Sequence, residues 1–196
     1  MARPRTITDE RLLTAAGTVI GQVGPGFTLA QVAAEAGVAV GTVAQRFGSK
    51  SGLLQALSRL NTQSVVGRMR ECGEVADPVE GLRAALVAVY EGIGSADTAA
   101  NHLGQLGADI GDPELRALLG AHFTAVEAEL RRLVRVAARD LPNAPGVVRA
   151  ARVLMGVANG ASLDWSIRPK GRYVDRMGQD VDAVLTAWKG SVRSGS

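Results

Sequence analysis

The chain has 196 residues, of which 46% are hydrophobic and 4% aromatic, and its formal net charge at pH 7 is +3. Its single cysteine, Cys72, excludes an internal disulfide and any multi-cysteine metal site. The N-terminus lacks the apolar core of a signal peptide, and no apolar run reaches the roughly 18 residues that a membrane span needs. We therefore expect a cytoplasmic, all-α protein that uses no membrane, metal or cofactor and builds its core from leucine, valine, isoleucine and alanine.

The first helix is predicted after Thr8, a residue type that caps helix N-termini. Asp9 and Glu10 suit the positive end of the helix dipole. The apolar residues that follow recur at helical spacing: Leu12, Leu13, Ala16, Val19 and Ile20. The segment 24–26, Gly-Pro-Gly, then ends the helix.

Three further helices are predicted before the middle of the chain. Thr28 caps the first of them, with Gln31 at the capping-box position three residues later, and Gly37 ends it. The next spans about 40–47, and Ser49 is placed to cap a longer one. The apolar residues of that longer helix are Leu53, Leu54, Leu57 and Leu60.

The rest of the chain is punctuated by glycine and proline. After a weak region over 73–78, helices are predicted over 82–93, 98–110, 113–137, 146–167 and 174–192. The segment 98–110 has the loosest pattern. The helix at 113–137 is the strongest, because Asp112 and Pro113 suit a helix cap and the first helical position. The last helix has a clean amphipathic stripe that ends at Val192.

Residues 28–50 have the spacing of a helix-turn-helix, in which two helices cross steeply about a tight turn. Gly37 tolerates positive φ in the turn, and Ala33 provides a small side chain where the helices touch. The residues expected to bury the shared face are Val32, Val38 and Val43, with Phe47 on the same side. Alanine-rich helical hairpins produce this spacing by chance as well, so the short segment alone leaves both interpretations open.

The surrounding sequence carries further features: Ala15-Ala16, Gly26-Phe27-Thr28, Ala36-Gly37-Val38, Gly41-Thr42, Phe47, Ser49-Lys50 and Leu53-Leu54. Together they resemble the N-terminal domain of the TetR family of transcriptional regulators, over about the first quarter of the chain. The resemblance implies an all-α fold with two parts. A three-helix helix-turn-helix domain would occupy 1–50, and a helical ligand-binding and dimerisation domain would occupy 51–196.

The function that the resemblance implies is that of a ligand-responsive transcriptional repressor. It would bind a palindromic double-stranded DNA operator as a homodimer and be released by an unknown small-molecule effector. We expect no enzyme activity, because the sequence has neither a glycine-rich phosphate loop after a strand nor a Gly-x-Ser-x-Gly elbow. The alternative is a helical ligand-binding or interaction module with weakened or lost DNA binding, which Ala39 and Ala44 support.

The residues expected to contact DNA are Thr28, Gln31, Val40, Gly41, Thr42, Ala44, Gln45, Arg46 and Lys50. Thr28 would offer its hydroxyl and nearby backbone N–H groups to a phosphate, and the resemblance places Thr42 and Lys50 at positions that hold the DNA backbone. Gln45 and Arg46 are best suited to base recognition, since glutamine pairs with adenine and arginine with guanine. The N-terminal residues Arg3 and Arg5 are expected either to reach a minor groove or to remain solvated charge.

Three residues depart from the pattern of the family. Ala39 stands where a hydroxyl residue usually caps the recognition helix, a loss of roughly 0.5–2 kcal/mol. Ala44 replaces a tyrosine that contacts phosphate, and Arg46 replaces a histidine. We therefore expect backbone anchoring to shift towards Arg46, Lys50 and the N-terminal arm.

The effector pocket is expected where polar and aromatic residues lie among apolar helical faces. The candidates are Tyr90, Asn101, His102, Gln105, Leu106, His122, Phe123, Met155, Asn159 and Trp165. A metal site is not expected from two widely separated histidines. For the dimer interface, Gly156, Ala158, Gly160 and Ala161 allow close helix approach, and Trp188 is the largest member of the last stripe. Ordinary packing within the chain is the alternative for these residues.

Overall fold

The computed structural model describes residues 7–190. Over that range it contains α-helices and short 3-10 turns and no strand, which confirms the all-α prediction. None of the helices in this range combines the length and the hydropathy of a membrane span. Arg3, Arg5 and Val192, on which the sequence predictions above also drew, lie outside the described residues.

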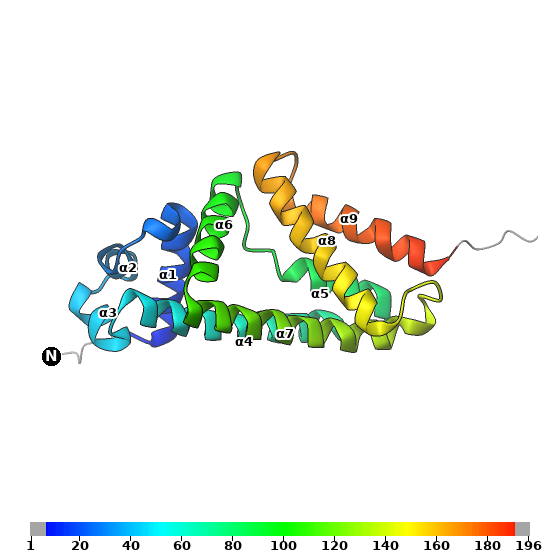
Figure 1. The fold of residues 1–196 in the computed structure, drawn as a ribbon, viewed down its shortest axis with the longest axis horizontal. Coiled ribbons are helices and arrows are strands. Elements are labelled where there is room, and N and C mark those ends of the chain that lie inside the picture. Colours follow the sequence, from blue (N-terminus) through cyan, green and yellow to red (C-terminus); the bar gives the residue numbers. More distant parts are fainter. Residues whose placement is uncertain (1–6, 191–196) are drawn as a thin grey trace, which may run out of the picture. The chain divides into compact units, whose positions relative to one another are not determined.

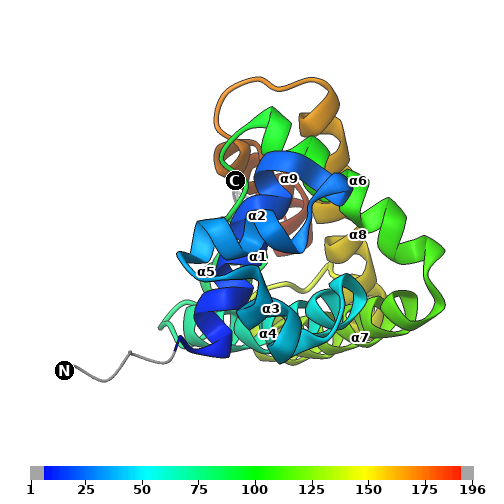
Figure 2. The same cartoon turned by 90° about the vertical axis from the view of Figure 1, so that its left-hand side faces the viewer.

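The chain divides into two compact units, and the first comprises the residues up to Thr62 together with Asp97–His122. Its elements are α1 (Asp9–Val23), α2 (Leu29–Ala36), α3 (Val40–Phe47), the first part of α4 (Lys50–Gly73), most of α6 (Ala96–Gly111) and the first part of α7 (Pro113–Val136). α1 packs on α2 and α2 packs on α3, as Figure 2 shows. The predicted caps are present: Thr8 Oγ1 accepts from the Arg11 N–H at 3.3 Å, and Ser49 Oγ accepts from the Gly52 N–H at 3.0 Å.

One apolar core joins the first three helices to the start of α4. Leu12 and Ala16 of α1, Val32 of α2 and Val43 of α3 are fully buried, and Phe27, between α1 and α2, is 1% exposed. The shared face predicted for the helix-turn-helix is therefore confirmed. The partly buried residues of that face are Val38 and Phe47.

Glycines bring α6 close to the C-terminal end of α1. Asn101 Nδ2 donates to the carbonyl oxygen of Gly21 at 2.9 Å. A β-carbon on Gly24 would lie 2.9 Å from Asn101 Oδ1, and one on Gly104 would lie 3.2 Å from Cδ of Pro25. Larger residues would therefore separate α6 from the helix on which the helix-turn-helix packs.

The second unit comprises Gln63–Ala96 and the chain from Phe123 onwards. It contains the remaining parts of α4 and α7, together with α5 (Pro78–Ala88), α8 (Val147–Ile167) and α9 (Tyr173–Lys189). α8 and α9 lie side by side, and α9 also packs on α5 (Figure 1). The apolar stripe of α9 faces the interior of this unit. Its buried members are Met177, Val181, Leu185 and Trp188.

Two predicted helix ends are wrong, and one segment is more regular than predicted. α5 ends at Ala88 and does not reach Ile93, because the chain turns before Gly92. The segment 98–110, predicted to be the loosest, lies within a regular helix of 16 residues, because packing against α1 offsets the low helix propensity of its glycines. α9 ends at Lys189, where Gly190 adopts φ 78°.

Candidate functional site

The turn between α2 and α3 has the predicted conformation. Gly37 adopts φ 69° and ψ 36°, in the left-handed region that glycine occupies without steric cost. Its N–H donates to the Ala34 carbonyl at 3.1 Å, and the Val38 N–H donates to the Ala33 carbonyl at 2.9 Å. These bonds satisfy the last carbonyls of α2 and fix the direction in which the chain continues. The described residues thus contain a helix-turn-helix, with α3 as its second helix.

The N-terminus of α2 is closed by the predicted capping box. The Gln31 N–H donates to Thr28 Oγ1 at 3.3 Å, and the Thr28 N–H donates to Gln31 Oε1 at 2.8 Å. The Thr28 hydroxyl also donates to Gln31 Oε1 at 3.1 Å. Both side chains are exposed, and these bonds orient them against each other at the helix end.

α3 buries one face and exposes the other. Val43 is fully buried, whereas Val40 is 50% exposed. At the helical spacing of 100° per residue, Gly41 and Gln45 lie opposite Val43, and Arg46 lies on the side that meets α1. Among the predicted DNA contacts on this helix, the exposed ones are Val40, Gly41, Gln45 and Arg46, and the partly buried ones are Thr42 and Ala44.

No side chain caps the N-terminus of α3, because alanine occupies the cap position, residue 39. We expect Ala39→Ser to raise the free energy of unfolding by about 0.5–2 kcal/mol, since the serine oxygen would accept from a backbone N–H of the first turn. Urea unfolding followed by circular dichroism measures the change. The control is Ala34→Ser at an exposed position inside α2, where serine is expected to be slightly unfavourable. Equal stability of the two variants would contradict the prediction.

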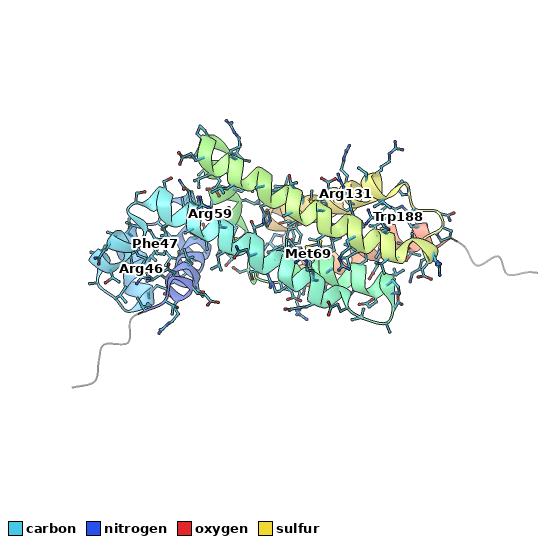
Figure 3. The ribbon with its side chains drawn as sticks, turned by 90° about the horizontal axis from the view of Figure 1, so that it is seen from below. Arg46, Phe47, Arg59, Met69, Arg131 and Trp188 are labelled. Carbon is cyan, nitrogen blue, oxygen red and sulfur yellow. The ribbon has the colours of Figure 1, made fainter. Side chains whose placement is uncertain are left out.

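The two basic residues of the predicted interface are held by contacts inside the first unit. Arg46, labelled in Figure 3, forms an ion pair with Asp9 at the start of α1. Lys50 Nζ donates to the carbonyl oxygens of Pro25 at 2.6 Å and Phe27 at 2.7 Å, and it lies 4.2 Å from the Phe27 ring centroid. Lys50 therefore fastens the start of α4 to the turn before α2. The pairing of Asp9 with Arg46 could not be predicted from local spacing, because 37 positions separate the two residues.

A cavity of about 230 Å³ lies in the first unit, lined by α1, α4, α6 and α7. Its lining residues are Gly17, Ile20, Leu54, Leu57, Ser58, Asn61, His102, Gln105, Leu106, Asp109, Leu119 and His122. Of the predicted effector contacts, the structure brings His102, Gln105, Leu106 and His122 together here. Asp109 was missed, because an acidic residue on a helix with a loose apolar pattern resembles an ordinary solvated residue.

Asn101 lies in the first unit but does not line the cavity, since it donates to the Gly21 carbonyl. The other predicted effector contacts belong to the second unit: Tyr90, Phe123, Met155, Asn159 and Trp165. The Tyr90 hydroxyl donates to Asn159 Oδ1 at 2.6 Å. The centroid of the Tyr173 ring lies 5.2 Å from that of Trp165 and 6.2 Å from that of Tyr90. Burial raises the pKa of Tyr173 to about 12 and also raises the pKa of Tyr90. Both phenols therefore stay neutral in a packed aromatic cluster, in which Tyr173 had not been predicted.

α8 carries an exposed apolar face. Leu163 is 51% exposed and Ile167 is 69% exposed. Val153, Gly156 and Gly160 are also exposed, and their spacing places all five on one side of the helix. Exposed apolar stripes of this kind mark interaction surfaces. For the Trp188 stripe of α9, by contrast, the structure shows packing within the chain.

Comparison with known proteins agrees with this architecture. Residues 12–57 match the family model for bacterial regulatory proteins of the tetR family. No curated protein sequence matches the chain.

Several solved structures match the fold over nearly its whole length. A transcriptional regulator from Rhodococcus sp. Rha1 has a TM-score of 0.72 at 19% identity, covering 94% of this chain and 100% of that one. A TetR-family regulator from Agrobacterium tumefaciens has a TM-score of 0.73 at 22% identity, with coverages of 93% and 97%. The fatty acid degradation regulator FadR from Bacillus halodurans has a TM-score of 0.71 at 18% identity, with coverages of 95% and 100%. At these identities the likeness establishes the fold.

Proposed function

Because the chain carries an N-terminal TetR-family domain on the fold of TetR-family transcriptional regulators, we propose that it is a DNA-binding transcriptional repressor. Its homodimer binds a palindromic double-stranded operator in the cytoplasm, and a small-molecule effector releases it. DNA binding is assigned to residues 1–50, and effector binding and dimerisation to 51–196. The observation that supports this proposal best is the exposed face of α3 after the left-handed turn at Gly37.

Base recognition is assigned to α3 in the major groove. The small side chains of this helix allow a close approach to the base edges, and Val40 and Ala44 are suited to thymine methyl groups. Gln45 is suited to adenine and Arg46 to guanine. Both Gln45 and Arg46 are exposed, which supports these assignments.

Phosphate binding is assigned to the ends of the helices around α3. Thr28 and Gln31 present the N-terminus of α2, whose N–H groups and dipole attract an anion. Thr42 belongs to the first turn of α3, where the same argument applies. Lys50 uses two of the three donors of its ammonium group within the chain, and the third is assigned to a phosphate.

Arg46 is the residue whose replacement tests base recognition most directly. Arg46→Ala is expected to weaken DNA binding by about 1–3 kcal/mol, the usual value for an arginine that contacts a base. Asp9→Asn is expected to strengthen binding, because it releases Arg46 from its ion pair and removes a negative charge near the DNA. Fluorescence anisotropy measures both, with a duplex that the protein selects from a random library.

The control for this measurement is Arg135→Ala, at an exposed arginine of α7 in the second unit. It removes the same charge without touching the helix-turn-helix and is expected to leave the affinity unchanged. A titration over a range of salt concentrations accompanies each variant, because phosphate contacts release counterions and make binding strongly salt-dependent. Binding that is independent of salt and unaffected by Arg46→Ala would overturn the proposed repressor.

A helical ligand-binding or interaction module without DNA binding is the second candidate. The uncapped α3 favours it, since Ala39 contributes no hydrogen bond to the helix that should enter the groove. This candidate requires that no duplex is selected from the library at low salt. Selection of a palindromic duplex by the unmodified protein would exclude it.

A further inference from the structure

The cavity of the first unit combines apolar side chains with a small polar group of residues. Its volume of about 230 Å³ is below the roughly 300–1,000 Å³ of sites for drug-sized ligands, so it suits a small molecule. The apolar part is contributed by Ile20, Leu54, Leu57, Leu106 and Leu119. The polar part centres on Gln105 and Asp109 of α6.

Gln105 is unusually deeply buried for a polar residue, since only 7% of its surface is exposed. Its Nε2 donates to Asp109 Oδ1 at 2.7 Å. Its Oε1 is buried and accepts no hydrogen bond from any residue between 7 and 190. A buried carbonyl without a donor is costly, and a ligand that donates a hydrogen bond at this position would satisfy it.

The charge of the cavity favours a cation. Among the described residues that line it, Asp109 alone is charged at neutral pH. Burial raises the pKa of Asp109, the Gln105 hydrogen bond lowers it, and Asp112 nearby raises it further. Desolvation lowers the pKa of both His102 and His122, although His102 as a whole is exposed. The histidines therefore do not neutralise the carboxylate.

His122 is also poorly placed to bind an anion through its Nδ1 hydrogen. The Thr62 hydroxyl donates its proton to the Ser58 carbonyl at 2.9 Å, so its oxygen acts as acceptor in the 3.0 Å contact with His122 Nδ1. That N–H is thereby committed to Thr62. An anionic ligand would face Asp109 without this donor and without any lysine or arginine among the lining residues.

We propose that this cavity binds a small protonated amine, whose N–H groups donate to Gln105 Oε1 and to the Asp109 carboxylate. The leucine and isoleucine side chains receive its hydrocarbon part. Charge-assisted hydrogen bonds in a partly desolvated site are stronger than neutral ones. The site therefore discriminates a cation from an uncharged or anionic molecule of the same shape.

Binding in this cavity places the ligand against the helix-turn-helix support. Gly17 and Ile20 of α1 line the cavity, and Ile20 belongs to the core on which α2 and α3 pack. His102 also lies against α1, since a β-carbon on Gly21 would be 3.5 Å from its Nε2. The amine is accordingly assigned as the effector. That role rests on the proposed repressor function, whereas binding itself does not.

The chain has two histidines, and both line the cavity. Their ring C–H signals in a ¹H–¹³C spectrum of the full chain therefore report on this site. The titration uses benzylammonium, benzyl alcohol and benzoate at a pH above the ordinary histidine pKa of roughly 6.5. Saturable shifts of both histidines by benzylammonium are expected, with affinity at least about tenfold above the other two compounds. Equal or tighter binding of benzoate or benzyl alcohol, or no shift with any compound, would overturn the proposal.

Two substitutions test the residues that define the site. Asp109→Asn and Gln105→Leu are each expected to weaken benzylammonium binding by about tenfold or more. Asp109 is only partly buried, so its asparagine variant keeps the test valid if Gln105→Leu disturbs the core. Glu74→Gln, at an exposed position between α4 and α5, is the matched control and is expected to bind as the unmodified protein does. Unchanged affinity of folded Asp109→Asn would refute the assignment.

The effector role has a separate readout. With the selected duplex, benzylammonium is expected to change DNA affinity in the unmodified protein and not in Asp109→Asn. Amine binding without any duplex being selected would refute the repressor function and leave the binding site standing. A selected duplex whose affinity does not respond to a bound amine would refute the effector role alone.

Discussion

Phe27→Ala is expected to abolish DNA binding and to lower the free energy of unfolding by about 3–5 kcal/mol, the usual cost of deleting a buried aromatic side chain. Phe27 is 1% exposed and belongs to the core that joins α1, α2, α3 and the start of α4. The Lys50 ammonium also lies over its ring, 4.2 Å from the centroid, in a cation–π contact. Removing the ring leaves a void at the point where α2 leaves α1, so α3 loses its support.

The measurement is urea unfolding, with anisotropy for DNA affinity. Phe27→Leu separates the two parts of the effect, because leucine fills much of the void but cannot hold the cation. Combining it with Lys50→Met in a double-mutant cycle isolates the ring–ammonium coupling, expected at about 0.5–2 kcal/mol. Val23→Ala, at an exposed apolar residue of α1, is the control and should change stability little. A Phe27→Ala variant as stable as this control would show that the ring does not organise the unit.

Leu163→Asp is expected to convert the proposed homodimer into a monomer and to weaken operator binding by about 100-fold or more, because the two half-sites are then bound independently. Leu163 is 51% exposed on the α8 face that also carries Ile167 and the small residues Gly156 and Gly160. The glycines permit close approach of a second helix, and a charge at the centre of such a contact is costly to bury. Light scattering after size exclusion measures the mass.

Val75→Asp is the matched control, since Val75 is an exposed valine in the segment before α5. It adds the same charge at an exposed apolar residue away from α8, and it is expected to leave both mass and DNA affinity unchanged. A dimer that survives Leu163→Asp with unchanged affinity would exclude this face of α8 as the interface. A monomeric unmodified protein would exclude the proposed homodimer itself.

Structural features that depend on residues three or four positions apart were predicted correctly. Thr28 and Gln31 form the expected capping box, and Gly37 adopts the left-handed conformation of the expected turn. Ala39 does not cap α3, because its methyl group cannot accept a hydrogen bond. In each case the interacting groups are close in sequence, so the residue types alone determine whether the hydrogen bond forms.

The ends of the helices, and the helices against which each of them packs, were predicted less well. The segment 98–110 has a weak apolar pattern because polar residues make some of its long-range contacts, as Asn101 does with the Gly21 carbonyl 80 positions away. The stripe of α9 had two interpretations, and the structure shows packing within the chain for Trp188. Periodicity identifies an apolar face, but it carries no information on which surface covers that face.

The proposed effector site was likewise predicted only in part. His102, Gln105, Leu106 and His122 were expected, and the structure brings them together around one cavity. Asp109 was not expected, and neither was the burial of Gln105, which leaves its Oε1 without a donor among the described residues, beside the Asp109 carboxylate. The sequence by itself thus determined the helices, their caps and the helix-turn-helix, which depend on neighbours along the chain. Only the tertiary structure decided which polar groups are desolvated and which faces stay exposed, because these depend on helices far apart in sequence coming into contact.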